Sequence, residues 1–372
     1  MLPLPPAFRR AVLALLAALL PWFPLLAPSL GQAAPGRVVT DLAGRRVLVP
    51  PHPSRIVALG PGCLRLIVYL AAQDRVVGIE ALEQRFPEGR PYCLAHPELA
   101  RLPVITPGGV PAINNLPDLE GVLGVAPQVI FVTYLEKAKA DRLQDLLHLP
   151  VVVLGYGPLG SFDRVIYQSL RLAGQVLGVE ARARAVVEFL EAAQKDLARR
   201  SGGSGPAPPA YVGGLGFKGA QGLEGTDAGY LPLAWVGARN LAVGQGRGGH
   251  LILDREKLLA LDPPVIFLDG GGLALVGADY AKKPSFYQSL AAFRTPRVYL
   301  LFPFNWYATN LGTALADAYA LGKVLRPGAF ADVDLPAKAD EIFSFLCGGP
   351  VYGRLARRYG PLGGRPGFLD KE

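Results

Sequence analysis

One stretch of the sequence occurs twice, and this repeat limits the folds that the chain can adopt. "DLEGVLGVAPQVIF" begins at Asp118, "DREKLLALDPPVIF" begins at Asp254, and the two align without a gap. They share the aspartate, a glutamate two places on, a leucine, a proline and the final Val-Ile-Phe. Each copy is typical of a short helix that a proline ends, followed by a buried strand. Val-Ile-Phe strands are common enough for chance similarity, but the shared acidic residues favour a repeated structural unit.

Length and composition fit two such units. The chain has 372 residues, which is enough for two domains of ordinary size, and 51% of them are hydrophobic. The 45 glycines and 35 prolines predict many short connections. A disordered or low-complexity protein is therefore excluded.

Residues 1–33 have the pattern of a signal peptide. Arg9 and Arg10 precede an apolar run over residues 11–30, and small residues suited to cleavage follow near Ala34. The run is about long enough to anchor the chain in a membrane instead, but three prolines interrupt it and disfavour a spanning helix. No cysteine stands at the cleavage site, so a lipid anchor is not indicated. We expect an exported, periplasmic protein.

The charge pattern argues against nucleic-acid binding. The formal net charge is +8, of which the two arginines of the signal segment carry two. The remaining basic residues are scattered, and no run combines concentrated basic residues with interleaved aromatics. We expect no nucleic-acid partner.

Cys63, Cys93 and Cys347 are an odd set for an oxidising compartment. Cys63 and Cys93 either pair as a disulfide or remain buried free thiols, and the sequence leaves both possibilities open. Metal ligation needs closer spacing than these cysteines have. We expect neither a resident metal nor another cofactor.

Strand-like and helix-like runs alternate on both sides of a long helical stretch, from Phe162 to about Arg200, with a break at Gly178. Such alternation predicts parallel sheets covered by helices, hence an α/β protein of two lobes joined by a helix. A small hairpin around Ala43-Gly44 precedes the first lobe. We expect an N-terminal lobe over 36–160, linking helices over 161–203, a C-terminal lobe over 207–360 and a tail over 361–372.

Ligands of open parallel sheets bind beyond the carboxyl ends of the strands, and two loops at such ends stand out. "GLGFKG" from Gly214 matches Gly-x-Gly-x-x-Gly, but more glycines continue the loop and no acidic residue follows near position 235, which disfavours dinucleotide binding. Its backbone N–H groups beside Lys218 either hold an anion or form a simple tight turn. "FNWYATN" from Phe304 offers aromatic and amide groups to a ligand, with core packing of Trp306 as the alternative.

Signatures of catalysis are missing. The sequence contains no Gly-x-Ser-x-Gly and no His-Glu-x-x-His, and the histidines at 52, 96, 148 and 250 lie far apart. We therefore expect a protein that is not an enzyme.

The sequence resembles the periplasmic substrate-binding proteins of ABC importers for iron complexes, haem and cobalamin. The resemblance extends from about Val38 to Tyr352 and rests on the signal segment, "RIVALGPG", "LEGVLGVAPQVIFV", the long middle helix, "REKLLALDPPVIFLDGGG" and "GTALADAYALGKVLRP". It implies two Rossmann-like lobes with central parallel sheets, bridged by a single long helix, with the ligand held between them. It also implies that Glu120 and Glu256 pair with arginines of a permease, while helix-end residues without this role remain the alternative.

The ligand that the resemblance implies is an iron complex, such as a siderophore or haem. Molybdate, tungstate or cobalamin are the alternatives, because relatives with this fold bind different ligands. The implied partners are a permease dimer with its ATPase, and we expect a monomer. The candidate ligand-binding residues lie in the loops at the carboxyl ends of the expected strands: Gly62, Cys63, Arg85, Arg90, Tyr92, Tyr134, Lys218, Asn305, Trp306 and Tyr307.

Overall fold

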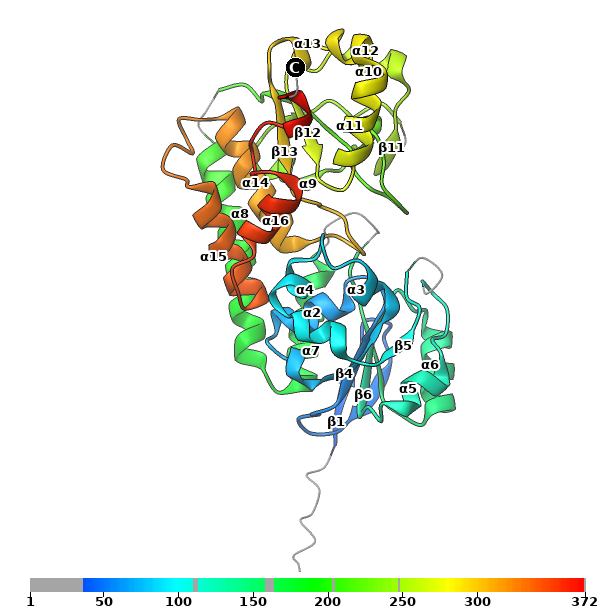
Figure 1. Ribbon diagram of the computed structural model, residues 1–372. Helices are drawn as coiled ribbons and strands as arrows, with labels where there is room; N and C mark the ends of the chain where they lie inside the picture. Colours follow the sequence, from blue (N-terminus) through cyan, green and yellow to red (C-terminus); the bar gives the residue numbers. More distant parts are fainter. Residues whose placement is uncertain (1–35, 110–112, 158–163, 203–204, 247, 371–372) are drawn as a thin grey trace, which may run out of the picture. The chain divides into compact units, whose positions relative to one another are not determined.

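The computed structural model describes residues 36–109, 113–157, 164–202, 205–246 and 248–370, and it confirms an α/β protein with two parallel sheets (Figure 1). The expected signal peptide, residues 1–33, lies outside the described residues. Within the described residues, no helix combines the length and the apolar character that crossing a membrane requires.

The first lobe is built on a five-stranded parallel sheet in the order β5-β4-β3-β6-β7. Successive residues of its central strands enter opposite core clusters, since Phe131 packs into one and Ile130 and Val132 into the other. Both faces are therefore covered, which explains why these strands are almost continuously apolar. The strands are β3 (Ile56–Leu59), β4 (Val76–Glu80), β5 (Val104–Thr106), β6 (Val129–Thr133) and β7 (Val151–Leu154). The helices of this lobe are α2 (Cys63–Tyr69), α3 (Ala81–Arg85), α4 (Pro91–Ala95), α5 (Leu119–Gly124) and α6 (Lys137–Leu147).

An antiparallel hairpin of β1 (Arg37–Thr40) and β2 (Arg46–Val49) precedes this sheet, as the sequence predicts. Gly44 adopts a positive φ of 73° in its turn.

The second lobe repeats the design with a four-stranded parallel sheet in the order β10-β8-β12-β13. Its strands are β8 (Pro209–Gly213), β10 (Arg239–Asn240), β12 (Ile266–Asp269) and β13 (Val298–Leu301), and a separate antiparallel pair consists of β9 (Gly225–Asp227) and β11 (His250–Ile252). The helices are α9 (Leu231–Trp235), α10 (Arg255–Leu261), α11 (Leu273–Lys282), α12 (Pro284–Gln288), α13 (Ala291–Arg294), α14 (Leu311–Leu325), α15 (Leu335–Cys347) and α16 (Tyr352–Tyr359). The expected tail packs on this lobe, because Leu300 exchanges backbone hydrogen bonds with Gly363 and Gly364.

The two copies of the repeat occupy equivalent places. Asp118 caps α5 and Asp254 caps α10, each accepting backbone N–H bonds with its side chain. Each helix ends in a turn with a positive φ at the same repeat position, 43° at Ala126 and 31° at Asp262. The following strands, β6 and β12, lie between β3 and β7 and between β8 and β13. The repeated sequence thus encodes one helix-turn-strand unit in each lobe.

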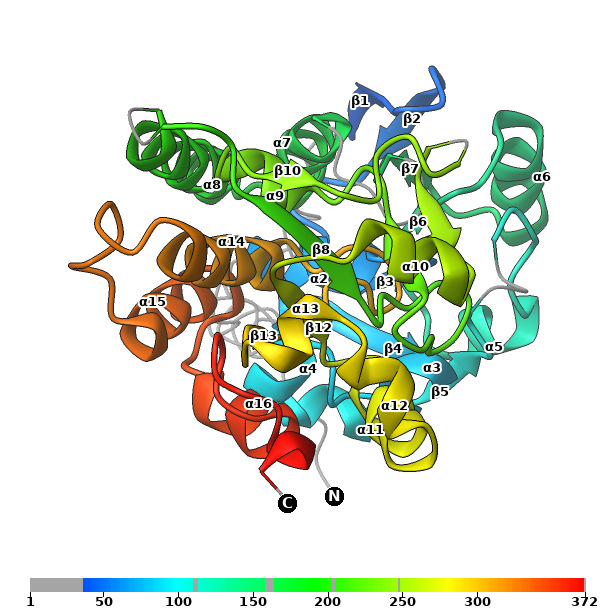
Figure 2. The same cartoon turned by 90° about the horizontal axis from the view of Figure 1, so that it is seen from above.

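Two consecutive helices connect the sheets, and the predicted break at Gly178 is confirmed. Helix α7 (Val165–Leu177) ends where Gly178 adopts a φ of 69°, and α8 (Glu180–Ser201) follows. Helix α8 packs against α7 and also against α9 and α14, so it contacts both lobes. Figure 2 shows α8, α14 and α15 running next to one another.

Helix α15 adds a second connection between the lobes. It follows the second sheet in the chain but packs against α2 and α4 of the first lobe. His96 places Nε2 2.7 Å from the carbonyl oxygen of Cys347, and Arg182 on α8 donates from Nε to the carbonyl oxygen of Tyr69 at 2.9 Å. The expected lobe boundaries near residues 160 and 203 lie outside the described residues, so the exact domain limits stay a prediction.

Candidate functional site

A pocket of about 470 Å³ lies where loops of both lobes meet at the carboxyl ends of their strands. The first lobe contributes the segment after β4, and the second contributes the glycine-rich loop after β8 and the loop after β13. The sequence-predicted residues that line it are Arg90, Lys218, Asn305, Trp306 and Tyr307.

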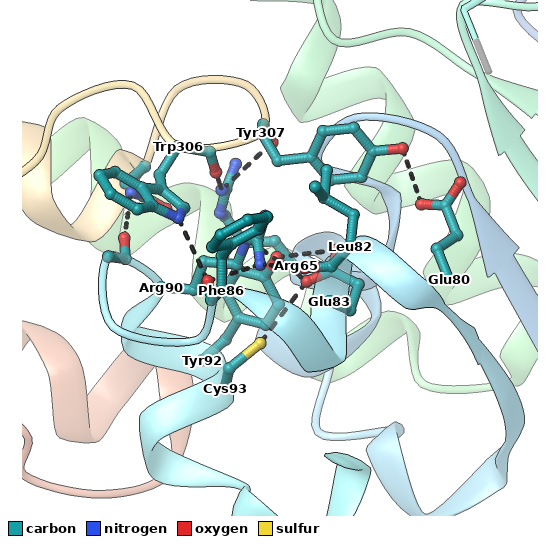
Figure 3. A network of polar contacts seen from close by, with 12 residues as sticks. Arg65, Glu80, Leu82, Glu83, Phe86, Arg90, Tyr92, Cys93, Trp306 and Tyr307 are labelled. Atoms are coloured by element: carbon teal, nitrogen blue, oxygen red, sulfur yellow. Dashed lines mark hydrogen bonds and ion pairs between the residues drawn. The ribbon is translucent and has the colours of Figure 1, made fainter. Parts of the chain in front are cut away.

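The pocket wall is mainly aromatic and apolar, with Phe86, Phe217 and Trp306 among its lining residues. Trp306 donates its indole N–H to the carbonyl oxygen of Phe86 at 3.2 Å, across the two lobes (Figure 3). Its ring also lies against Gly89, where an added Cβ would approach the indole to 2.4 Å. Trp306 is therefore held by the first lobe although it belongs to the second, and it is partly exposed rather than a core residue.

Arg65 fixes the backbone of the loop that carries Trp306. Its Nη1 donates to the carbonyl oxygen of Thr309 at 2.7 Å, and its Nη2 donates to that of Trp306 at 3.0 Å. The side chain is fully buried, also donates to the Tyr156 hydroxyl, and lies over the Tyr92 ring at 5.1 Å. A buried charge is tolerated only with such partners, so Arg65 connects α2 to the loop over residues 304–310.

Two glycines give Arg65 this position. Gly60 and Gly62 adopt φ values of 88° and 78°, which let the chain turn sharply from β3 into α2. A Cβ at Gly62 would lie 2.3 Å from the Tyr156 ring, so only glycine allows the approach. Helix α2 starts at the next residue and places Arg65 in its first turn.

Buried polar side chains link the loops of the second lobe. Asp269, at the end of β12, accepts the N–H of Gly271 and the N–H of Phe304, each at 2.8 Å. Burial raises the pKa of Asp269 to about 7. Asn310 donates from Nδ2 to the carbonyl oxygen of Gly89 at 2.8 Å, which joins the same loop to the first lobe.

Glu80 and Tyr307 form another polar contact between the lobes. The Tyr307 hydroxyl donates to Oε2 of Glu80 at 2.8 Å and accepts the N–H of Gly109 at 3.0 Å. Gly60 donates its N–H to Oε1 of Glu80 at 3.1 Å. Burial, followed by the nearby charge of Glu83, raises the pKa of Glu80 to about 8. Glu80 also lines a separate cavity of about 370 Å³ in the first lobe, beside Thr106 and Thr133.

The two basic residues of the pocket differ in their exposure and in their hydrogen-bond partners. Arg90 is buried and donates from Nη1 to the carbonyl oxygens of Leu82 and Phe86, with its Nε 3.5 Å from Glu83. Lys218 is exposed and lies over the Phe217 ring at 5.5 Å. Lys218 is therefore the better placed of the two to meet an anionic group of a ligand.

The other sequence-predicted residues do not line the pocket. Gly62 and Cys63 are buried, Arg85 is exposed on α3, and Tyr92 is buried and donates to Glu83 at 2.7 Å. Tyr134 instead donates to the carbonyl oxygen of Gly157 at 2.8 Å.

The cysteine pairing that the sequence left open does not form. Cys63, Cys93 and Cys347 are free and buried. Burial raises the pKa of each thiol, with neighbouring carboxylates adding to the effect at Cys63 and Cys93. Among the described residues, no group of histidines, cysteines and carboxylates is arranged to hold a metal ion.

Sequence reasoning missed Arg65, Glu80, Phe86 and Asp269. A signal for Arg65 exists, because it is a single charge in the apolar run "CLRLIVY" and such a charge must find buried partners. Glu80 and Asp269 are the last residues of β4 and β12. They lie at the carboxyl ends of parallel strands, where ligands of such sheets bind.

Glu80 predicts a pH dependence of stability. The folded carboxyl keeps its proton up to a pKa of about 8, whereas the unfolded one releases it near 4.5. The folded state binds more protons between these values, so stability falls as the pH rises through this window. We expect the free energy of unfolding of the natural protein, relative to Glu80→Gln, to fall by roughly 3 kcal/mol between about pH 5 and pH 8, at about 1.4 kcal/mol per pKa unit.

Urea unfolding over a pH series measures this difference. Glu188→Gln, at an exposed position on α8, is the control and should follow the natural protein at every pH. Parallel curves for the natural protein and Glu80→Gln would contradict the raised pKa.

The chain is similar to known binding proteins in sequence. Residues 56–303 match the family model described as periplasmic binding protein. The molybdate-binding protein MolA of Haemophilus influenzae is 25% identical over 338 residues, which cover 84% of this chain and 91% of MolA.

Solved structures show the same fold. The structure of MolA bound to molybdate has a TM-score of 0.67 at 21% identity, covering 84% of this chain and 98% of that one. A periplasmic solute-binding protein of Veillonella parvula has a TM-score of 0.69 at 18% identity, covering 87% of this chain and 96% of that one. A periplasmic haem-binding protein of Pseudomonas aeruginosa has a TM-score of 0.52 at 24% identity, covering 74% of this chain and 94% of that one. Because the family model matches well over half of its residues, this chain belongs to the periplasmic binding protein family.

Proposed function

We propose that the protein is the extracytoplasmic solute-binding component of an ABC importer and captures an anionic metal chelate, such as a ferric siderophore or haem. The observation that carries this proposal is the pocket of about 470 Å³, with its aromatic wall and exposed Lys218. An organic chelate offers apolar surface to Phe86, Phe217 and Trp306 and a negative charge to Lys218. The protein delivers this ligand to a permease and does not change it.

The donors of the pocket favour a ligand larger than a bare oxyanion. Trp306, Asn305 and Arg90 direct N–H groups at protein carbonyl oxygens. A tetrahedral oxyanion needs several converging donors, and it would fill only a small part of the volume and leave the aromatic wall uncovered. A chelate needs fewer polar contacts because the apolar wall contributes to its binding.

Molybdate or tungstate is a second candidate, favoured by two observations. One is the similarity to MolA over 84% of the chain. The other is the glycine-rich loop, in which Lys218 and Gly219 adopt φ values of 53° and 137° and line the pocket with Gly216. Backbone of this kind can point successive N–H groups at an anion.

Binding measurements separate the two ligands. We expect isothermal titration calorimetry to detect a ferric siderophore or haem. Trp306→Ala and Lys218→Met should each weaken its binding, Trp306→Ala by about 1–3 kcal/mol because an aromatic anchor is lost. Trp235→Phe and Lys195→Met, which alter residues outside the pocket lining, should bind normally. Binding of molybdate alone, unaffected by Trp306→Ala, would overturn the chelate and favour the oxyanion.

Glu120 and Glu256 are proposed to dock the two lobes onto the permease. Both are exposed in the first turns of the equivalent helices α5 and α10. Within the described residues, neither carboxylate has a hydrogen-bond or ion-pair partner, so both remain available to arginines of another protein. The equivalent positions suit a transporter of two similar halves.

We expect Glu120→Ala combined with Glu256→Ala to leave ligand affinity unchanged and to abolish uptake, because the permease contact is lost while the pocket is untouched. Uptake is measured in vesicles that contain the permease and its ATPase. Glu136→Ala with Glu188→Ala removes two exposed carboxylates, one at the N-cap of α6 and one on α8, and should support normal uptake. Unchanged transport by the first pair would remove the docking role.

A further inference from the structure

The repeated helices share a second exposed feature, which the glutamates do not explain. Leu123 on α5 and Leu259 on α10 occupy the same place in the repeat, three residues after Glu120 and Glu256. Their side chains are 49% and 39% exposed. Because residues three apart lie on one face of a helix, each glutamate has an exposed leucine beside it.

Core packing does not require these leucines. The residue before each of them, Val122 on α5 and Leu258 on α10, is fully buried and attaches its helix to the lobe. Leu123 and Leu259 therefore leave apolar surface in water without contributing to the cores. A single exposed leucine is ordinary on a protein surface, but the same one at equivalent places in both lobes is a pattern.

Each lobe also has a further exposed aliphatic residue in a segment that neighbours the repeated helix in space or in sequence. Val104, in the strand β5 that packs against α5, is 46% exposed. Ile252, two residues before the cap Asp254 of α10, is 66% exposed. Each lobe thus presents a carboxylate together with exposed aliphatic side chains near the start of the repeated helix.

We propose that Leu123 and Leu259 are the apolar contacts of two matched docking patches, one on each lobe, which bind the two equivalent halves of a membrane permease. This inference rests on the proposed function and adds to it the residues that supply binding energy. An exposed ion pair alone contributes little to binding and is screened by salt. Contact cores of interfaces are apolar and exclude water, so a leucine beside each glutamate supplies what the ion pair lacks.

The occurrence of the same patch in both lobes indicates which partner binds there. Both patches belong to a single chain and have the same sequence order of carboxylate and leucine. A partner that engages both needs two equivalent surfaces, which a dimeric permease provides. The complementary surface on each half is a basic residue beside an apolar recess.

The test replaces both leucines by a polar residue of similar size. Leu123→Gln with Leu259→Gln should weaken binding to the permease–ATPase complex in lipid nanodiscs by tenfold or more and lower uptake. The affinity for the transported ligand and the unfolding temperature should stay unchanged, because neither side chain is in a core or lines the pocket. Leu146→Gln with Leu275→Gln is the matched control, since each of these leucines is 47% exposed on another helix, α6 or α11. This control should dock and transport normally.

Other outcomes overturn the inference in distinguishable ways. One such outcome is that the leucine variant docks normally while Glu120→Ala with Glu256→Ala does not dock. That result would leave the proposed function intact and remove the leucines from the interface. Normal docking of both variants would remove the proposed docking face as well. If the natural protein is a dimer by light scattering and the leucine variant a monomer, the patches bind a second copy of this chain and not the permease.

Discussion

The loop over residues 304–310, which follows β13, depends on one buried guanidinium. Arg65 belongs to the first lobe, yet its hydrogen bonds end on carbonyl oxygens of Trp306, Tyr307 and Thr309 in the second. Burying a charge costs several kcal/mol unless its hydrogen-bonding groups are satisfied. Here Nη1 and Nη2 donate to carbonyl oxygens and a tyrosine hydroxyl instead of a carboxylate, while Nε has no hydrogen-bond partner among the described residues. The loop after β13 is consequently part of the second lobe by sequence and is held by the first lobe through these bonds.

This anchoring explains how the loop keeps an unfavourable backbone. Tyr307 and Ala308 adopt φ values of 59° and 69°, which residues with a Cβ rarely adopt. Such conformations persist only where surrounding contacts hold them, and the bonds from Arg65 to the carbonyl groups of this stretch provide such contacts. Trp306 and Tyr307 thereby face the pocket, while Asn310 and Glu80 add further bonds across the lobes. The backbone of this loop is therefore held by contacts that come from the first lobe.

The sequence predicts the architecture well because apolar periodicity and the glycines and prolines that end helices and strands are local signals. The alternating apolar runs, the break at Gly178 and the repeated unit at Asp118 and Asp254 are all recognisable from the chain itself. Half of the candidate ligand residues line the pocket for a similar reason, since loops at strand ends can be assigned without coordinates. Arg65 and Glu80 act through partners more than two hundred residues away, and no local pattern specifies which loop they meet. Tyr92 and Cys63 follow turns of the expected kind, but their side chains point into the core.

We predict that Arg65 holds the loop over residues 304–310 specifically, and hydrogen exchange of Arg65→Lys tests this most directly. Lysine keeps the charge but cannot reproduce the planar fork that reaches several carbonyl groups. We expect the backbone amides of this loop to exchange at least tenfold faster in the variant, while amides of β6 and β12 keep their protection. Unchanged exchange in the loop, or an equal increase throughout both sheets, would contradict it.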